Sequence, residues 1–215
     1  MNRAMLCLVG LLSCGSILIA CGDDSTGGGG SGATGGSGGS GATGGAGGGE
    51  VAATCADYCA TITSGCTANN KQYQDAAACE AECAAFDAGT LGAMSGNSLE
   101  CRAYHAGVAA GGTDPAIHCV HAGPLGGGPT AGDGCGTDAC ESFCQISEQI
   151  CSGDPGYVFD NFDDCMTQCA TYTDDTDFNM MVTSGDNLAC RMYHLSVAAT
   201  GDLSHCAHLS GALCQ

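Results

Sequence analysis

Histidine is the residue type whose spacing in this chain could support chemistry, and the six histidines form two equivalent sets. The sets are His105, His118 and His121, and His194, His205 and His208. In each set the first histidine follows a cysteine by four residues, and the other two belong to a His-Cys-x-His segment. Imidazole nitrogens bind zinc, copper and other transition metals, and also haem iron. Each set therefore contains the donors for one metal or haem site.

Two interpretations of these histidines are open. In one, each set binds a transition metal or haem, either through three imidazoles with help from a residue such as Tyr104, or together with nearby free thiolates. In the other, the Tyr-His pairs pack between helices, the His-Cys-x-His segments cap helix ends, and the protein holds no cofactor. We expect the second, because an exported chain with many cysteines oxidises them. The absence of Cys-x-x-Cys-His excludes covalent c-type haem.

The histidines belong to a longer internal repeat. The segment at residues 95–110 reads Ser-Gly-x-x-Leu-x-Cys-Arg-x-Tyr-His-x-x-Val-Ala-Ala, and the same frame recurs at residues 184–199. Such self-similarity is typical of tandem units. We therefore expect two modules, module 1 at residues 51–135 and module 2 at residues 136–215.

Each module is predicted to be all-α, with three helices and no strands. Cys55, Cys59, Ile62 and Cys66 form one helical stripe, and the later segments repeat this spacing. The helices are expected at 50–66, 72–86 and 97–110 in module 1, and at 137–151, 161–172 and 186–199 in module 2.

Sixteen of the 19 cysteines lie in the modules, eight in each. An even number in an exported chain indicates a disulfide framework. Each module has roughly 80 residues and few large aliphatic side chains, a size at which one hydrophobic core is marginal. Disulfides are therefore expected to hold each module, which is self-sufficient in cysteines and expected to fold alone.

The paired Cys-x3-Cys helices resemble the twin Cys-x3-Cys hairpins of small helical disulfide proteins. That resemblance implies Cys55–Cys83 and Cys59–Cys79 in module 1, and Cys140–Cys169 and Cys144–Cys165 in module 2. For the others, expected proximity of helix ends favours Cys66–Cys119, Cys101–Cys135, Cys151–Cys206 and Cys190–Cys214. Eight cysteines allow 105 connectivities, so the pairing stays open at this point.

The first residues predict a targeting segment. Arg3 precedes an apolar run that ends in Leu18-Ile19-Ala20-Cys21, and this tetrapeptide resembles the lipobox of bacterial lipoproteins. The resemblance implies a signal peptide at residues 1–20 and a lipid on Cys21, whereas an ordinary secretory signal cut near Ala20 is the alternative. Gly22 after the cysteine favours the outer membrane over the inner. Residues 21–50, which are mostly Gly, Ser, Thr and Ala, are expected to form a disordered tether reaching roughly 25–30 Å.

The charge balance limits the partners. The chain has 23 acidic and four basic residues, a net charge of −19 that repels nucleic acid. Arg102 and Arg191 share one repeat position and are each expected to bond a local carboxylate. No catalytic motif is present. The sequence therefore predicts a lipid-anchored, non-enzymatic envelope protein that binds an unknown protein or surface ligand or has a structural role, with metal or haem capture as the alternative.

Overall fold

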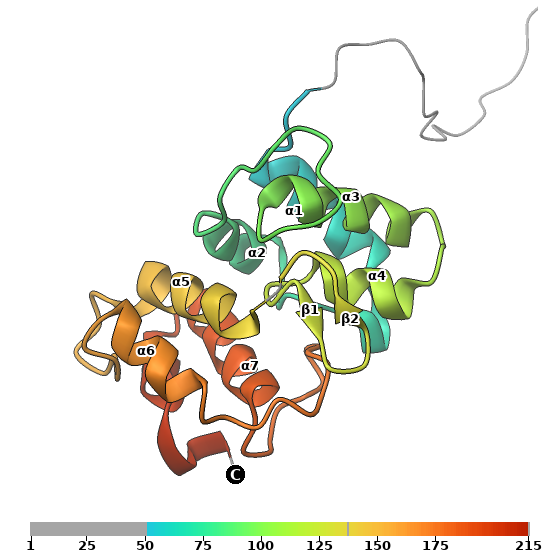
Figure 1. Ribbon diagram of the computed structural model, residues 1–215. Coiled ribbons are helices and arrows are strands. Elements are labelled where there is room, and N and C mark those ends of the chain that lie inside the picture. Colours follow the sequence, from blue (N-terminus) through green and yellow to red (C-terminus); the bar gives the residue numbers. More distant parts are fainter. Residues whose placement is uncertain (1–50, 137, 215) are drawn as a thin grey trace, which may run out of the picture. The chain divides into compact units, whose positions relative to one another are not determined.

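The computed structural model describes residues 51–136 and 138–214, which are mostly helical, as predicted (Figure 1). The signal peptide, the lipidated Cys21 and the linker expected at residues 1–50 lie outside this part. Module 1 contains α1 (Cys55–Gly65), the 3-10 helix η1 (Ala68–Asn70), α2 (Ala76–Cys83), α3 (Leu99–Ala110), α4 (Pro115–Ala122), β1 (Gly127–Gly128) and β2 (Gly132–Asp133). Module 2 contains α5 (Ala139–Cys151), α6 (Phe162–Cys169), α7 (Leu188–Ala198), and the 3-10 helices η2 (Leu203–His208) and η3 (Gly211–Cys214).

The helices begin later than the apolar spacing predicted, because capping side chains set their first residues. All the α-helices except α4 follow a residue whose side chain accepts a hydrogen bond from a backbone N–H of the first turn. These caps are Thr54, Asp75, Ser98, Asp138, Asn161 and Asn187. Helix α4 instead has a proline, Pro115, in its first turn.

The expectation of three helices per module was incomplete. The His-Cys-x-His segment forms a fourth helical element in each copy, α4 in module 1 and η2 in module 2. Module 1 also contains an antiparallel ribbon, in which Gly127 pairs with Asp133. The turn into the ribbon passes through Gly126, whose φ of +75° favours glycine. Glycines carry no alternating apolar pattern, so this segment has no strand signal in the sequence.

Eight disulfides connect these elements, and every one lies within a single module. They are Cys55–Cys83, Cys59–Cys79, Cys66–Cys119, Cys101–Cys135, Cys140–Cys169, Cys144–Cys165, Cys151–Cys206 and Cys190–Cys214. They join the same partners as the pairing expected from the sequence. Disulfides persist in oxidising compartments, so they indicate a location outside the cytoplasm. Within the described residues, no helix has the length and apolar character needed to cross a membrane.

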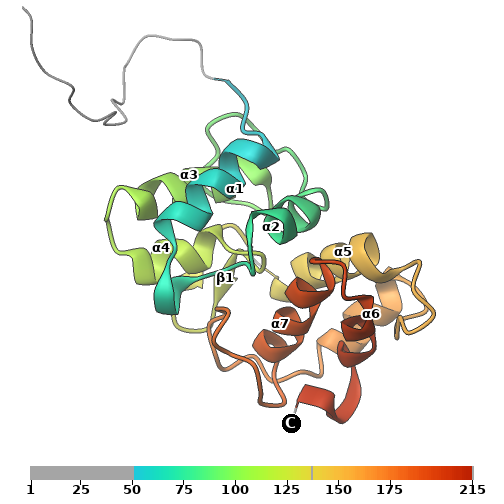
Figure 2. The same cartoon turned by 180° about the vertical axis from the view of Figure 1, so that it is seen from behind.

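Each module has its own buried core, and the two cores meet at α2. Helix α2 lies beside α5 and α7 (Figures 1 and 2). Phe86, just after α2, packs against both cores. Leu125 of module 1 is buried in the core of module 2. The modules therefore share a packed interface, although no disulfide among the described residues crosses it.

Candidate metal centres

The three histidines of module 1 converge, and we call this cluster site 1. His105 lies on α3, while His118 and His121 lie one turn apart on α4. Residues three apart on a helix share a face. Helices α3 and α4 pack against each other, and this packing brings the three rings together.

The nitrogens of site 1 are close enough to share one ion. His105 Nδ1 lies 2.8 Å from His118 Nδ1. One ligating nitrogen from each of the three rings lies within 4.8 Å of the others. His121 Nδ1 is buried and has no hydrogen-bond partner. An unpartnered buried polar atom is costly, and a bound ion would satisfy it.

Backbone carbonyls orient two of the site 1 rings. His105 Nε2 lies 3.2 Å from the carbonyl of Met94, and His121 Nε2 lies 3.0 Å from that of Ala131. A carbonyl only accepts, so each Nε2 must carry the proton and each Nδ1 must present a lone pair. Metal-binding histidines are typically held in this way by their second nitrogen.

Site 2 is the equivalent cluster of module 2, formed by His194 on α7 and by His205 and His208 on η2. His194 Nδ1 lies 2.8 Å from His205 Nδ1 and 3.2 Å from His208 Nδ1. The Oδ2 atom of Asp202 lies 3.6 Å from His205 Nε2. All three rings are half-buried, so site 2 is more open to solvent than site 1.

Burial keeps at least one ring of each site neutral. It lowers the pKa of His105 below its usual 6.5, and the neighbouring His121 and His118 add to this effect. In site 2, burial followed by the nearby His208 and His205 lowers the pKa of His194 to about 4. Neutral imidazole is the form that binds metals, so each of these two rings has an unprotonated nitrogen at neutral pH.

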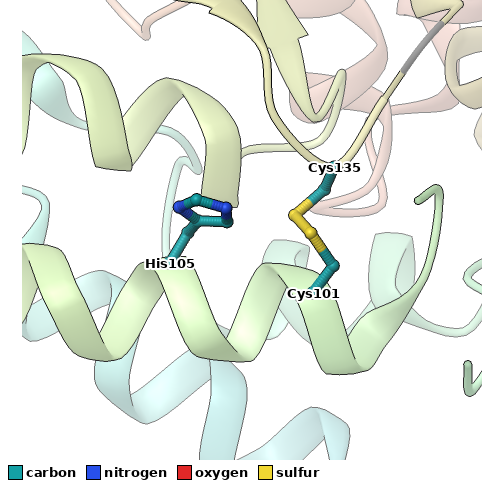
Figure 3. Close-up of side chains that lie close together, drawn as sticks. All are labelled: Cys101, His105 and Cys135. Carbon is teal, nitrogen blue, oxygen red and sulfur yellow. A yellow bond between two sulfur atoms is a disulfide. The ribbon is translucent and has the colours of Figure 1, made fainter. Parts of the chain in front are cut away.

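A disulfide flanks the first histidine of each site. The Cys101–Cys135 bond lies beside the His105 ring, with Cys101 one turn earlier on the same helix (Figure 3). Cys190–Cys214 has the same place beside His194. Because these sulfurs are bonded to each other, they are not thiolate ligands. The thiolate form of the metal site is therefore wrong. Tyr104 is exposed and packs edge-on against His105.

The two arginines differ in their partners. Arg191 Nη2 donates to Asp186 at 2.6 Å, as expected. The carboxylate expected for Arg102 was wrong: its guanidinium donates to the carbonyls of Ser98, Gly123 and Pro124 and to the Ser142 hydroxyl. Ser142 belongs to module 2, a contact that spacing within module 1 does not reveal.

Sequence reasoning found all six histidines but missed the groups that support them. The carbonyls of Met94 and Ala131 come from a loop and from the ribbon turn, where any residue type supplies the same acceptor. Gly134 packs against His121 so closely that an added Cβ would lie 2.2 Å from the ring. Of these supporting groups, only Gly134 depends on its residue type and could be noticed in the sequence. It lies in a glycine-rich segment that has no counterpart in module 2.

Comparison with known proteins identifies one relationship. Residues 50–138 and residues 130–212 each match the BfoA family C-terminal domain. No curated protein matches the chain, and no solved structure does.

Proposed function

The chain belongs to the BfoA family and contains two copies of its C-terminal domain in tandem, and we propose that it is an exported metal-binding protein. Each domain holds one divalent transition-metal ion on the Nδ1 atoms of three histidines. The observation that carries this proposal is the convergence of His105, His118 and His121 in one module and of His194, His205 and His208 in the other.

The distances suit a small cation. Zinc binds imidazole nitrogen at about 2.0–2.1 Å, which places tetrahedral ligands about 3.3–3.4 Å from one another. The observed Nδ1 separations of 2.8 and 3.2 Å are slightly shorter. One N–H···N hydrogen bond spans the 2.8 Å contact of each site. An entering ion replaces this bond and moves the rings apart by about a few tenths of an ångström.

The donor set favours copper and zinc. Imidazole suits zinc, copper and nickel, and affinities at a given nitrogen site rise from manganese to a maximum at copper. A haem held by two of these imidazoles does not fit, because two axial ligands approach the iron from opposite faces of the macrocycle. Stacked rings such as His105 and His118, with nitrogens 2.8 Å apart, leave no room for a porphyrin between them.

The proposal places these sites outside the cytoplasm on a lipid tether. Support comes from the lipobox-like Leu18-Ile19-Ala20-Cys21, the glycine-rich stretch that follows it, and eight disulfides. The Gly22 after Cys21 favours attachment to the outer membrane. In this arrangement the tethered sites bind metal ions near the membrane and catalyse no reaction.

Metal titration of the oxidised protein tests the function. Copper(II) or zinc(II) is titrated by calorimetry into the full chain, exported and purified without histidine tags. We expect two equivalents per chain. His118→Ala and His205→Ala, which remove one ligand from site 1 and site 2 respectively, should each reduce the stoichiometry to one. The two sites thus serve as controls for each other.

Two further measurements bear on the metal sites. X-ray absorption of the loaded protein should show nitrogen ligands at about 2.0–2.1 Å with no metal–sulfur bond. Binding that survives the double variant His118→Ala/His205→Ala would overturn the proposal, because the acidic surface would then be holding the ion.

The anchor has its own test. Mass spectrometry of the mature amino terminus should find a diacylated Cys21. Replacing residues 1–21 with an ordinary cleavable secretory signal should release the protein from membranes while both metal sites remain intact. An unmodified chain beginning after Ala20 would replace the anchor with ordinary secretion and leave the metal proposal unaffected.

A further inference from the structure

The contact between the two modules uses a face of module 1 whose equivalent in module 2 is open. Arg102 Nη2 of module 1 donates to Ser142 Oγ of α5 at 3.1 Å. Ser142 Oγ in turn donates to Asn97 Oδ1, and Ser196 of α7 donates to the buried Glu82. The start of α5 and one face of α7 therefore close over α2 and Arg102.

The repeat identifies the corresponding face of module 2. With Cys83 aligned to Cys169 and Cys101 to Cys190, each residue of the module 1 face has a counterpart. Glu82 corresponds to Gln168, Ala85 to Thr171, Phe86 to Tyr172, Asn97 to Asp186, and Arg102 to Arg191. These five counterparts, with Thr173 and Gly211, line an open pocket of about 420 Å³. Nothing in the described chain occupies the place that α5 takes on module 1.

A buried arginine with one unpartnered N–H lines this pocket. Arg191 is 3% exposed and stacks on Tyr172, as Arg102 stacks on Phe86. Its Nε has no hydrogen-bond partner among the described residues, whereas Arg102 Nε donates to the Gly123 carbonyl. A buried guanidinium N–H without an acceptor is costly, so the pocket favours a ligand that brings an oxygen.

Module 1 carries the matching surface. The position equivalent to Ser142 is Asp57, at the start of α1, and Ser196 corresponds to Gly107 on α3. Both Asp57 and Gly107 are exposed, as are Ala56 and Ala60 on the same helix as Asp57. This surface is made of small residues around one carboxylate, which complements the free Arg191 N–H.

The loop before α7 makes a second contact between the two modules. In module 2, the loop before α7 reaches module 1, where Met180 N–H donates to the Lys71 carbonyl and the Phe178 carbonyl accepts from Gln72. The equivalent loop of module 1 presents Leu91 and Met94, which are 45% and 60% exposed. The equivalent loop of module 2 contacts a neighbouring module. The exposed apolar side chains on this loop of module 1 therefore indicate a surface that can contact another protein.

We propose that the Arg191 pocket binds module 1 of a second copy of this chain, so that copies associate head to tail. Asp57 of the incoming copy takes the place of Ser142 and accepts from the Arg191 guanidinium, while the loop carrying Leu91 and Met94 lies against module 2. Because the two surfaces differ, the contact is heterologous and leaves a free surface at each end of a dimer. On a membrane it would connect tethered copies into rows.

Sedimentation velocity over a range of concentrations tests this contact. The chain is exported from an ordinary cleavable secretory signal in place of residues 1–21, which removes the lipid, and a chelator is present so that metal bridging plays no part. We expect mass to rise with concentration beyond a dimer. Thr171→Trp fills the pocket without touching the bonds of Arg191, and Asp57→Lys reverses the charge of the incoming surface. Each should weaken association at least about tenfold.

A charge exchange makes the test specific. Arg191→Glu and Asp57→Lys should each stay monomeric alone but associate when mixed, because the lysine introduced in one chain meets the glutamate introduced in the other. Asp163→Lys, at the other end of α6 from the pocket, matches the charge change of Asp57→Lys and should associate at least as well as the wild type. Circular dichroism checks that every variant is folded. A wild type that stays monomeric, or association that survives both Thr171→Trp and Asp57→Lys, would overturn the proposal.

Discussion

Modules 1 and 2 build the same histidine cluster with different support. In both, the first two rings are stacked, with centroids 5.1 and 5.0 Å apart, and their Nδ1 atoms lie 2.8 Å apart. Site 1 is more buried and two of its rings are oriented by carbonyls, whereas site 2 is half-buried, takes two of its histidines from a 3-10 helix and has Asp202 nearby. The repeat therefore fixes the ligand geometry, and the segments outside the repeat determine burial and orientation.

This difference leads to an expectation about metal exchange. Oriented, buried ligands lose less freedom when an ion binds, and surrounding groups strongly affect metal affinity. We therefore expect site 1 to bind more tightly and to exchange its ion more slowly than site 2, although the two stoichiometries are equal.

The largest effect should come from reducing the disulfides, because the unfolding of both modules would remove both metal sites. A native bridge in a small secreted domain contributes about 2–5 kcal/mol, and each module has four. A phosphine reductant should unfold both modules and release both metal ions, as measured by far-ultraviolet circular dichroism and a metal indicator. The corresponding phosphine oxide at the same concentration is the control. A helical signal that persists after complete reduction would mean that the apolar cores suffice.

The next largest effect concerns one repeat position, where module 1 has Glu82 and module 2 has Gln168. Glu82 is fully buried, and burial raises its pKa to about 8, against an opposing effect of the Ser196 hydrogen bond. Tyr58, Tyr73 and Arg102 are the other ionisable groups around it. Since the folded pKa exceeds the unfolded value of 4.5, stability falls as pH rises between these two values and then levels off.

Glu82→Gln should remove this pH dependence, because glutamine keeps an acceptor for Ser196 without a charge. We expect the variant to be more stable than the wild type by roughly 3–5 kcal/mol at pH 8, and the two to converge near pH 4. Guanidinium unfolding of the oxidised protein at several pH values measures this. Glu80→Gln makes the same change at an exposed position of α2, is the matched control and should change little. Equal pH profiles for Glu82→Gln and wild type would contradict the prediction.

The parts of this structure that follow from sequence are those fixed by spacing. Cys55 and Cys59 one turn apart must face another pair such as Cys79 and Cys83, and the repeated Cys-x3-His frame places His105 and His194 alike. These relations depend on the pitch of one helix, which sequence shows directly.

The rest depends on contacts between distant segments. Arg102 donates a hydrogen bond to the Ser142 hydroxyl, forty residues away, and no local sequence pattern predicts this contact. Likewise, the Ala131 carbonyl reaches His121 only because a glycine ribbon folds back over α4. For the same reason, the sequence alone does not decide whether the three histidines of module 1 converge. Their convergence needs the packing of α3 on α4.

A smaller effect should separate the two sites through Gly134. An added Cβ there would overlap the His121 ring, so Gly134→Ala must push the ring away from the other two. We expect the metal affinity of site 1 to fall roughly 10- to 100-fold while site 2 is unchanged. Calorimetry on the His205→Ala background, where only site 1 binds, isolates the effect. Gly153→Ala adds the same methyl group where nothing lies within 4 Å and should leave binding unchanged.

The smallest effect should come from Asp202, which is the acidic neighbour of site 2. Its carboxylate lies near His205 Nε2 and favours the proton on that nitrogen, which leaves Nδ1 free for the metal. The side chain is largely exposed, so solvent screens most of this influence. Asp202→Asn should therefore weaken metal binding at site 2 by no more than a few-fold, as measured on the His118→Ala background, and high salt should shrink the difference further. A loss as large as that of Gly134→Ala at site 1 would show that an exposed carboxylate orients its histidine as effectively as the buried ribbon does. The two sites would then be equally well supported, by different means.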